Sequence, residues 1–132
     1  MNSKSFDEIT ARLKEMHFGE RFDMIVAIAN GGLVPAALIN QLLNVDVQVL
    51  RINFKDEKQK PRYDSPQLLQ QINFDFKGKR ILLVDDRIKS GATIVLAKEL
   101  LKEAAVIKTF AVNGNADYAL YNENCFRLPW TL

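Results

Sequence analysis

The sequence is poor in several features that would point to particular protein classes. It has one cysteine, Cys125, in 132 residues, so an internal disulfide is excluded. Its 18 basic and 16 acidic residues leave a net charge of only +2, which argues against nucleic acid as a partner. No N-terminal apolar stretch resembles a signal peptide or a membrane span. We therefore expect a cytoplasmic protein without a membrane segment.

The apolar content is sufficient for one core. With 48% hydrophobic residues, no internal repeat and no low-complexity linker, residues 1–132 are predicted to form a single domain. Ser5 to Glu8 has the spacing of a capping box and opens an amphipathic helix. Apolar and β-branched runs predict strands at 24–29, 45–54, 81–84 and 106–112, and helical patterns predict helices at 33–43 and 92–104. Strands that alternate with helices in this way predict an α/β fold.

The most informative segment runs from Ile81 to Thr93. An apolar strand is followed by two adjacent carboxylates, Asp85 and Asp86, and then by a loop of small and hydroxylated residues that opens a helix. Backbone N–H groups and hydroxyls at such a helix start can hold a phosphate. The carboxylates are placed for sugar hydroxyls and a divalent cation. This segment therefore predicts a sugar-phosphate site.

A second strand-to-helix loop contains Asn30, Gly31 and Gly32. Ligands of open α/β sheets bind at the carboxyl ends of the strands, so both loops are expected to face one site. The glycines would permit a positive φ or a close approach to a second anionic group. A tight turn without a ligand would need the same residues.

Residues 53–66 form a long polar stretch without apolar periodicity. Its basic residues are Lys55, Lys58, Lys60 and Arg62. A basic loop beside phosphate-binding loops could close over a polyanion as a lid. A solvated charged loop would look the same in the sequence.

These motifs resemble those of the type I phosphoribosyltransferases (PRTases). The segment from Val84 to Thr93 is similar to their signature for phosphoribosyl pyrophosphate (PRPP). The segment from Ile28 to Ala36 resembles the pyrophosphate loop of the small xanthine–guanine type members, and Leu128-Pro129-Trp130 resembles the end of their C-terminal segment. The resemblance implies a three-layer fold with a central, mainly parallel sheet, flanking helices and a small hood. It also implies a homodimer.

The resemblance implies a role for each motif in moving phosphoribose from PRPP to a nitrogenous, purine-like base. Asp85 and Asp86 would contact the ribose hydroxyls directly or through Mg²⁺ and stabilise a cationic sugar. The 5′-phosphate loop would comprise Lys89, Ser90, Gly91, Ala92 and Thr93. The pyrophosphate loop would comprise Asn30, Gly31 and Gly32, and the base pocket would use Phe126 and Trp130.

Three positions depart from the pattern of the family. Lys89 stands where the 6-oxopurine transferases carry an aspartate that assists proton transfer, so we count it among the candidate catalytic residues. Asn30 stands where close relatives have an arginine, and Cys125 where the xanthine–guanine type has a base-stacking tryptophan. Two functions therefore stay open: a transferase with an unusual base, and a non-catalytic protein that binds PRPP or a nucleoside monophosphate and signals to a partner.

Overall fold

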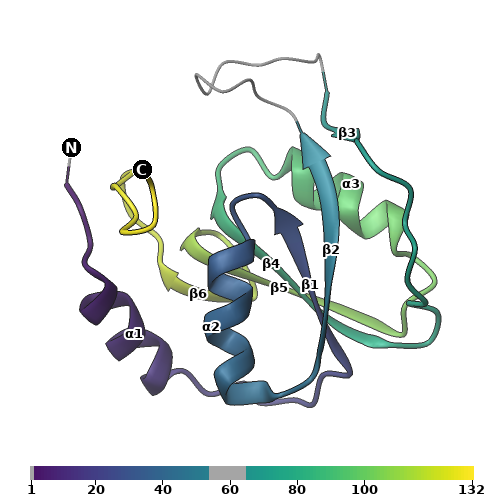
Figure 1. The fold of residues 1–132 in the computed structure, drawn as a ribbon, viewed down its shortest axis with the longest axis horizontal. Coiled ribbons are helices and arrows are strands. Elements are labelled where there is room, and N and C mark those ends of the chain that lie inside the picture. The colour runs from purple at the N-terminus through teal and green to yellow at the C-terminus, as the bar shows by residue number, and fades with distance from the viewer. Residues whose placement is uncertain (1, 54–64) are drawn as a thin grey trace.

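The sheet has six strands in the order β3-β2-β1-β4-β5-β6 (Figure 1). This is a computed structural model that describes residues 2–53 and 65–132. Its helices are α1 (Phe6–Glu15), α2 (Leu33–Leu43) and α3 (Ala92–Leu100). Its strands are β1 (Met24–Ala29), β2 (Asp46–Asn53), β3 (Gln67–Leu68), β4 (Arg80–Ile88), β5 (Val106–Gly114) and β6 (Tyr118–Tyr121). All neighbouring strands pair in parallel except β2 and β3, which are antiparallel.

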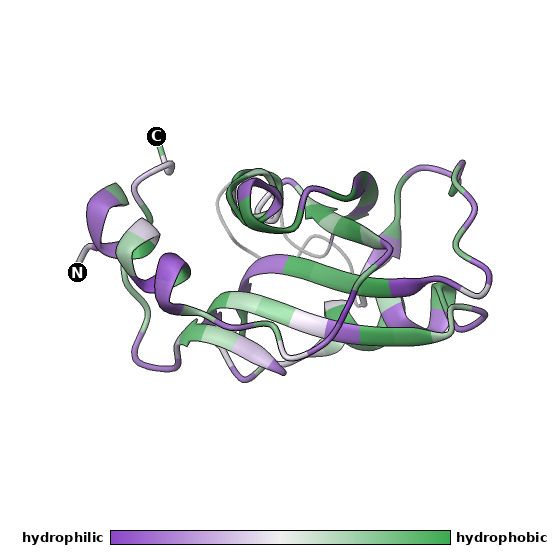
Figure 2. Ribbon diagram, turned by 90° about the horizontal axis from the view of Figure 1, so that it is seen from below, coloured by the Kyte–Doolittle hydropathy of each residue, from purple (hydrophilic) through white to green (hydrophobic). Residues whose placement is uncertain are grey.

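The central strands are buried on both faces, which is why their sequences read as unbroken apolar runs. Successive residues of β1 point to opposite faces: Ile25 and Ala27 pack in one core cluster, while Val26 and Ile28 pack in the other. The first cluster includes buried residues of α1 and α2, and the second includes those of α3. Figure 2 shows the apolar centre of these strands. The sheet thus lies between two helical layers, as predicted.

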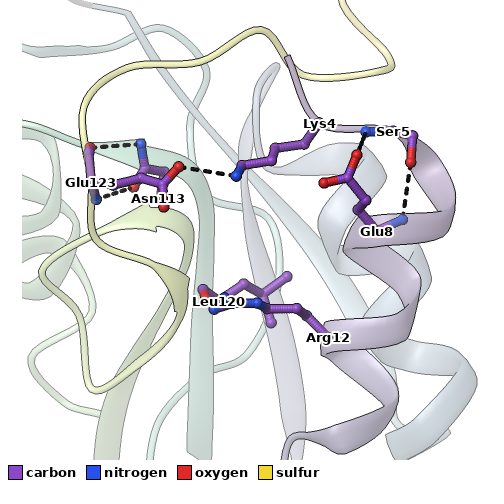
Figure 3. Close-up of polar contacts among 7 residues, drawn as sticks. All are labelled: Lys4, Ser5, Glu8, Arg12, Asn113, Leu120 and Glu123. Atoms are coloured by element: carbon purple, nitrogen blue, oxygen red, sulfur yellow. Dashed lines mark hydrogen bonds and ion pairs between the residues drawn. The ribbon is translucent and has the colours of Figure 1, made fainter. Parts of the chain in front are cut away.

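The first residues of the chain lie beside its C-terminal segment. Ser3 forms a β-bridge with Arg127, and Lys4 is ion-paired with Glu123 at 3.1 Å. Figure 3 shows this pair and the Arg12 guanidinium, which donates to the Leu120 carbonyl. We call residues 2–5 together with residues 122–132 the terminal hood. The first two contacts hold the two parts of the hood together, and the Arg12 bond joins α1 to β6. The Lys4 ammonium also lies 4.6 Å from the centroid of the Tyr121 ring in β6.

Three parts of the fold differ from the prediction. β4 continues to Ile88, so Asp85 and Asp86 lie within its last residues instead of after it. This extension is stabilised by pairing with β5, including Arg87 opposite Asn113. α3 ends at Leu100 instead of residue 104, and the chain turns at once so that the Ala105 N–H donates to the Lys79 carbonyl. Strands β3 and β6 were not predicted.

None of the described helices combines the length and apolar character that a membrane span requires.

Candidate functional site

A cleft of about 630 Å³ lies at the carboxyl ends of β1, β2 and β4. It brings together both loops that the sequence singled out. Its lining includes Asn30, Gly31, Asp85, Asp86, Lys89, Ser90, Gly91, Ala92 and Thr93. The parallel sheet explains this convergence, because the loops after parallel strands emerge at one edge.

The two carboxylates are held in fixed orientations by local hydrogen bonds. Asp85 Oδ1 accepts from the Asp86 N–H at 2.8 Å, and Asp86 Oδ1 accepts from the Arg87 N–H at 2.7 Å. Burial, together with the neighbouring charge of Asp86, raises the pKa of Asp85 well above its ordinary value of 3.8. Ionised Asp85 is therefore destabilised until a cation or a hydrogen-bond donor reaches it.

The start of α3 is open toward the cleft. Its first turn follows Gly91, which has a φ of 83° and provides no side-chain cap. Only glycine adopts this backbone conformation without appreciable strain. The Ser90 hydroxyl accepts from the Ala92 N–H at 3.3 Å. Because Gly91 itself provides no cap, the other N–H groups of this first turn can accommodate an anion.

The two glycines after β1 have different roles. A Cβ at Gly31 would lie 2.5 Å from the Asp86 carboxylate, so this glycine permits close approach of the two loops. A Cβ at Gly32 would collide with the Val84 carbonyl and lie 2.8 Å from the Ile28 carbonyl. Gly32 is buried and does not line the cleft, which favours the tight-turn interpretation for it. Neither glycine has a positive φ, so the lack of room for a Cβ, and not the backbone conformation, accounts for glycine at both positions. The preceding Ala29–Asn30 peptide bond is cis.

Two cationic side chains follow the carboxylates. Lys89 is exposed, and within residues 2–53 and 65–132 it forms no ion pair with a carboxylate. Arg87 instead bridges to the terminal hood, because its Nη2 donates to the Phe126 carbonyl at 2.7 Å. Its Nε is buried without a hydrogen-bond partner in the described part of the chain. Arg87 is thus suited to holding the hood, whereas the charge of Lys89 is available to a ligand.

A second cleft of about 210 Å³ adjoins the first, since Arg87, Ile88 and Lys89 line both. Its remaining lining residues are Asn113, Gly114, Asn122, Glu123 and Cys125. The Asn113 side chain donates to the Glu123 carbonyl at 3.1 Å and accepts from the Glu123 N–H at 3.0 Å (Figure 3). These two bonds fix the hood wall of this cleft.

The two aromatic residues predicted for the base pocket, Phe126 and Trp130, line neither cleft. Phe126 is only 1% exposed and packs in the core, with its ring centroid 5.2 Å from that of Tyr121. Trp130 packs edge-on against Phe6 at 5.8 Å and lines neither cleft. Phe126 is therefore a core residue, whereas Trp130 is partly buried. The predicted lid residues Lys55, Lys58, Lys60 and Arg62 lie outside the described residues.

Sequence reasoning missed Arg51, which lies near the end of β2 and lines the larger cleft. Its Nη1 donates to Asn30 Oδ1 at 3.4 Å. The available signal was positional: an arginine near the carboxyl end of a strand predicted to join the same parallel sheet. Once 45–54 is read as a strand neighbouring 24–29, its polar residues near that edge become candidates.

The carboxylates fit a magnesium ion that is shared with a substrate. Mg²⁺ is usually bound by one or two carboxylates together with water and phosphate oxygens. Among the described residues no group of three or more His, Cys, Asp or Glu side chains could hold a metal ion. Asp85 and Asp86 are adjacent in β4 and both line the larger cleft, so their carboxylates can face one cation there. Asp85 and Asp86 are therefore the residues that would hold Mg²⁺.

Comparison with known proteins agrees with this arrangement. The chain is 29% identical over 120 residues to a xanthine-guanine phosphoribosyltransferase of Idiomarina loihiensis, which covers 86% of this chain and 73% of that protein. It is 37% identical over 90 residues to the enzyme of the same description from Chromohalobacter salexigens, covering 68% of this chain but only 53% of the relative. Among solved structures, a purine phosphoribosyltransferase from Pyrococcus horikoshii superposes with a TM-score of 0.79 at 26% identity, covering 97% of this chain and 92% of that one.

The family model for the phosphoribosyl transferase domain matches residues 2–127, nearly the whole chain. This stretch contains both loops, the two carboxylates and the start of α3. The chain therefore belongs to the phosphoribosyl transferase domain family.

Proposed function

We propose that the protein transfers phosphoribose from PRPP to a purine-like nitrogenous base and releases pyrophosphate. The observation that carries this proposal is the meeting, in one cleft, of an open helix start, a carboxylate pair and a glycine turn. PRPP presents the matching chemistry: a 5′-phosphate, ribose hydroxyls and a pyrophosphate. Membership of the family and the named activities of the relatives support the same reaction.

The start of α3 would hold the 5′-phosphate. Backbone N–H groups of its first turn and the hydroxyls of Ser90 and Thr93 are the donors, and Lys89 supplies the positive charge. Charge-assisted hydrogen bonds of this kind contribute roughly 1.5–3 kcal/mol each. Because these donors lie at the end of a helix packed on the sheet, they are oriented before the ligand arrives.

The carboxylates would hold the ribose and stabilise positive charge on it. Departure of pyrophosphate from the sugar produces a transition state with cationic character at the ring, which nearby carboxylates favour electrostatically. Bound Mg²⁺ would supply neutralisation of the pyrophosphate charge. Asp85 and Asp86 are suited to both tasks because local hydrogen bonds already fix their orientation.

The acceptor base would occupy the smaller cleft beside Lys89. This cleft joins the larger one and is bounded on its other side by Asn113 and by the hood residues Glu123 and Cys125. Lys89 next to the base would oppose base protonation. At an effective dielectric constant of about 20, unit charges ~4 Å apart interact by roughly 4 kcal/mol. Two kinds of base suit this position best: a purine without a 6-oxo group, whose reaction does not need the proton transfer that an aspartate here would assist, and a base that carries its own negative charge.

A second candidate is a non-catalytic sensor of PRPP or a nucleoside monophosphate. The observation that favours it is Lys89, which lines both clefts without an ion pair to any described carboxylate. A lysine there can anchor a phosphate while it disfavours the proton transfer that 6-oxopurines require. In this case PRPP would bind without turnover.

Release of pyrophosphate from PRPP and Mg²⁺, measured across a panel of bases, separates the two functions. We expect release with at least one base among adenine, hypoxanthine, guanine, xanthine and orotate. Binding of PRPP without release for every base would favour the sensor. Lys89→Asp, which places a carboxylate beside the base, is expected to shift preference toward hypoxanthine and guanine; unchanged preference would remove Lys89 from base selection.

We also propose that the protein is a homodimer. Exposed apolar side chains lie on α2 and on the neighbouring strand β2, namely Leu33, Leu42, Val47 and Val49. Burying such side chains against a second copy would be favourable. Sedimentation of the wild type and of Leu42→Glu would test this, with the variant expected to be a monomer.

A further inference from the structure

Arg87 contacts the carboxylate pair through its backbone and the terminal hood through its side chain. Its N–H donates to Asp86 Oδ1 at 2.7 Å, and its Nη2 donates to the Phe126 carbonyl at 2.7 Å. Arg87 also lines both clefts. It therefore lies at the boundary between the larger cleft, which contains the carboxylates, and the smaller cleft, which is bounded by the hood.

The hood wall of the smaller cleft is held at two points by neighbouring strands. The Asn113 side chain, on β5, binds both the N–H and the carbonyl of Glu123. Three residues further along the hood, the Phe126 carbonyl is bound by Arg87 of β4. Arg87 and Asn113 are partners in the register of these two strands, so their side chains start from adjacent positions. Cys125, which lines the cleft, lies between the two held residues.

Stability alone does not account for an arginine at position 87. Within residues 2–53 and 65–132 its side chain forms no ion pair, and its Nε is buried without a hydrogen-bond partner. An unpaired buried donor destabilises a folded protein, and an apolar side chain would avoid that loss. What the guanidinium provides is a charged donor that reaches the Phe126 carbonyl. The bond to the hood is thus the feature that distinguishes Arg87 from an apolar residue.

We propose that Arg87 is a positioning residue, which fixes the hood wall relative to the carboxylates and thereby determines how tightly the acceptor base is held. This rests on the proposed function, which places the base in the smaller cleft. A wall that is already held in place needs no ordering when the base arrives, so less binding free energy is lost. Arg87 acts on the base through the wall and not by contact with it.

Calorimetry with two ligands isolates the contribution of the base. Ribose 5-phosphate has the phosphate and the sugar but no base. The second ligand is whichever of AMP, GMP, IMP, XMP and orotidine 5′-monophosphate binds the wild type most tightly, and the ratio of the two affinities measures the base contribution. Arg87→Met keeps a long side chain without the donor, and should lower this ratio about tenfold while ribose 5-phosphate affinity changes little. Arg87→Lys retains a charged donor and should restore part of the ratio.

Arg12→Met is the matched control. It removes the same kind of bond, from a guanidinium to the Leu120 carbonyl, at a residue that lines neither cleft. It should alter stability and leave the ratio unchanged. Asn113→Ala releases the wall at its other point and should lower the ratio as Arg87→Met does. The double variant should lower the ratio by less than the product of the two single effects, because either change alone already loosens the wall.

The Arg87 assignment is overturned by an unchanged ratio in Arg87→Met, or by an equal loss of both ligands. A loss in Arg87→Met that Asn113→Ala does not reproduce also overturns it, because Arg87 would then contact the base directly. Wild-type protein that binds every monophosphate no more tightly than ribose 5-phosphate would show that the wall does not hold a base. If the ratios change as expected but the wild type releases no pyrophosphate with any base, the proposed transfer fails and the role of Arg87 is supported.

Discussion

The first backbone N–H groups of a helix need hydrogen-bond acceptors, and α1 and α3 differ in whether the residue before the helix provides one. At α1 the Ser5 hydroxyl accepts from the Glu8 N–H at 3.1 Å, and the Glu8 carboxylate accepts from the Ser5 N–H at 3.2 Å (Figure 3). At α3, Gly91 offers no side-chain cap. α1 starts beside the terminal hood, whereas α3 starts in the cleft.

This difference separates residues that stabilise the fold from residues that await a ligand. Helix N–H groups need an acceptor, and the protein provides one at α1 from its own side chains. At α2 as well as α3, the residue before the helix is a glycine without a side-chain cap. Both of these helices start at the carboxyl edge of the sheet. Changes at α1 should therefore alter stability alone, and changes at the start of α3 should alter binding.

The largest effect is expected at Gly32. This glycine also precedes a helix and has no side-chain cap, but it is buried and does not line the cleft. Gly32→Ala places a Cβ against backbone atoms of β1 and β4, which cannot move away as a side chain can. We expect a loss of about 2–3 kcal/mol in the free energy of unfolding, measured by urea denaturation. A loss below about 0.5 kcal/mol would show that this turn adjusts freely, and that Gly32 is not required for packing.

Gly31→Ala should act on the site instead. Its Cβ would meet the Asp86 carboxylate, the end of a side chain that can rotate. We expect PRPP affinity to fall about tenfold, with little change in stability, because Asp86 must leave its position. Calorimetry and urea denaturation of the same preparation provide both values. Unchanged affinity would mean that the orientation of Asp86 does not matter for binding.

Ser5→Ala and Ser90→Ala form a matched pair across the two helix starts. Ser5→Ala should destabilise the protein by about 1 kcal/mol through loss of the cap and leave PRPP affinity unchanged. Ser90→Ala should weaken PRPP binding severalfold and alter stability less. Thermal unfolding with and without PRPP measures both effects. If Ser5→Ala weakened PRPP binding and Ser90→Ala mainly lowered stability, the proposed difference between the two helix starts would be wrong.

The smallest expected effect is a gain in stability from Asp85→Asn without ligand. The pKa of Asp85 is raised, so the folded protein binds this proton more tightly than the unfolded chain does, and ionisation at neutral pH disfavours folding. The gain should appear as the pH rises above 3.8 and level off beyond the raised pKa. Melting curves across this range measure it, and PRPP should no longer stabilise the variant. An Asp85→Asn protein that is less stable at pH 7 would contradict the pKa direction.

The regular part of the fold could be predicted because local pattern and burial agree there. The strand Met24–Ala29 and the helix Leu33–Leu43 have the bounds that the sequence indicated. β3 has only two residues and β6 only four, too few for a periodic signal. The end of α3 was missed because apolar residues continue past it, while the chain is turned by a hydrogen bond to Lys79, distant in sequence.

The site could be predicted where a motif lies on one loop, and not where it depends on neighbouring strands. The residues from Asp85 to Thr93 line the cleft together, as their order along one loop indicated. Arg51 reaches the cleft only through the pairing of β2 with β1. Phe126 was assigned to the base from its place in the C-terminal segment, but burial in the core decides its position.

Calorimetric titration of PRPP into the wild-type protein, with and without Mg²⁺, tests the central claim most directly, because it requires no knowledge of the acceptor base. The open start of α3 and the carboxylate pair predict saturable binding at one site per chain that is stronger with Mg²⁺. Absence of binding by folded protein under both conditions would contradict the account of this cleft as a PRPP site.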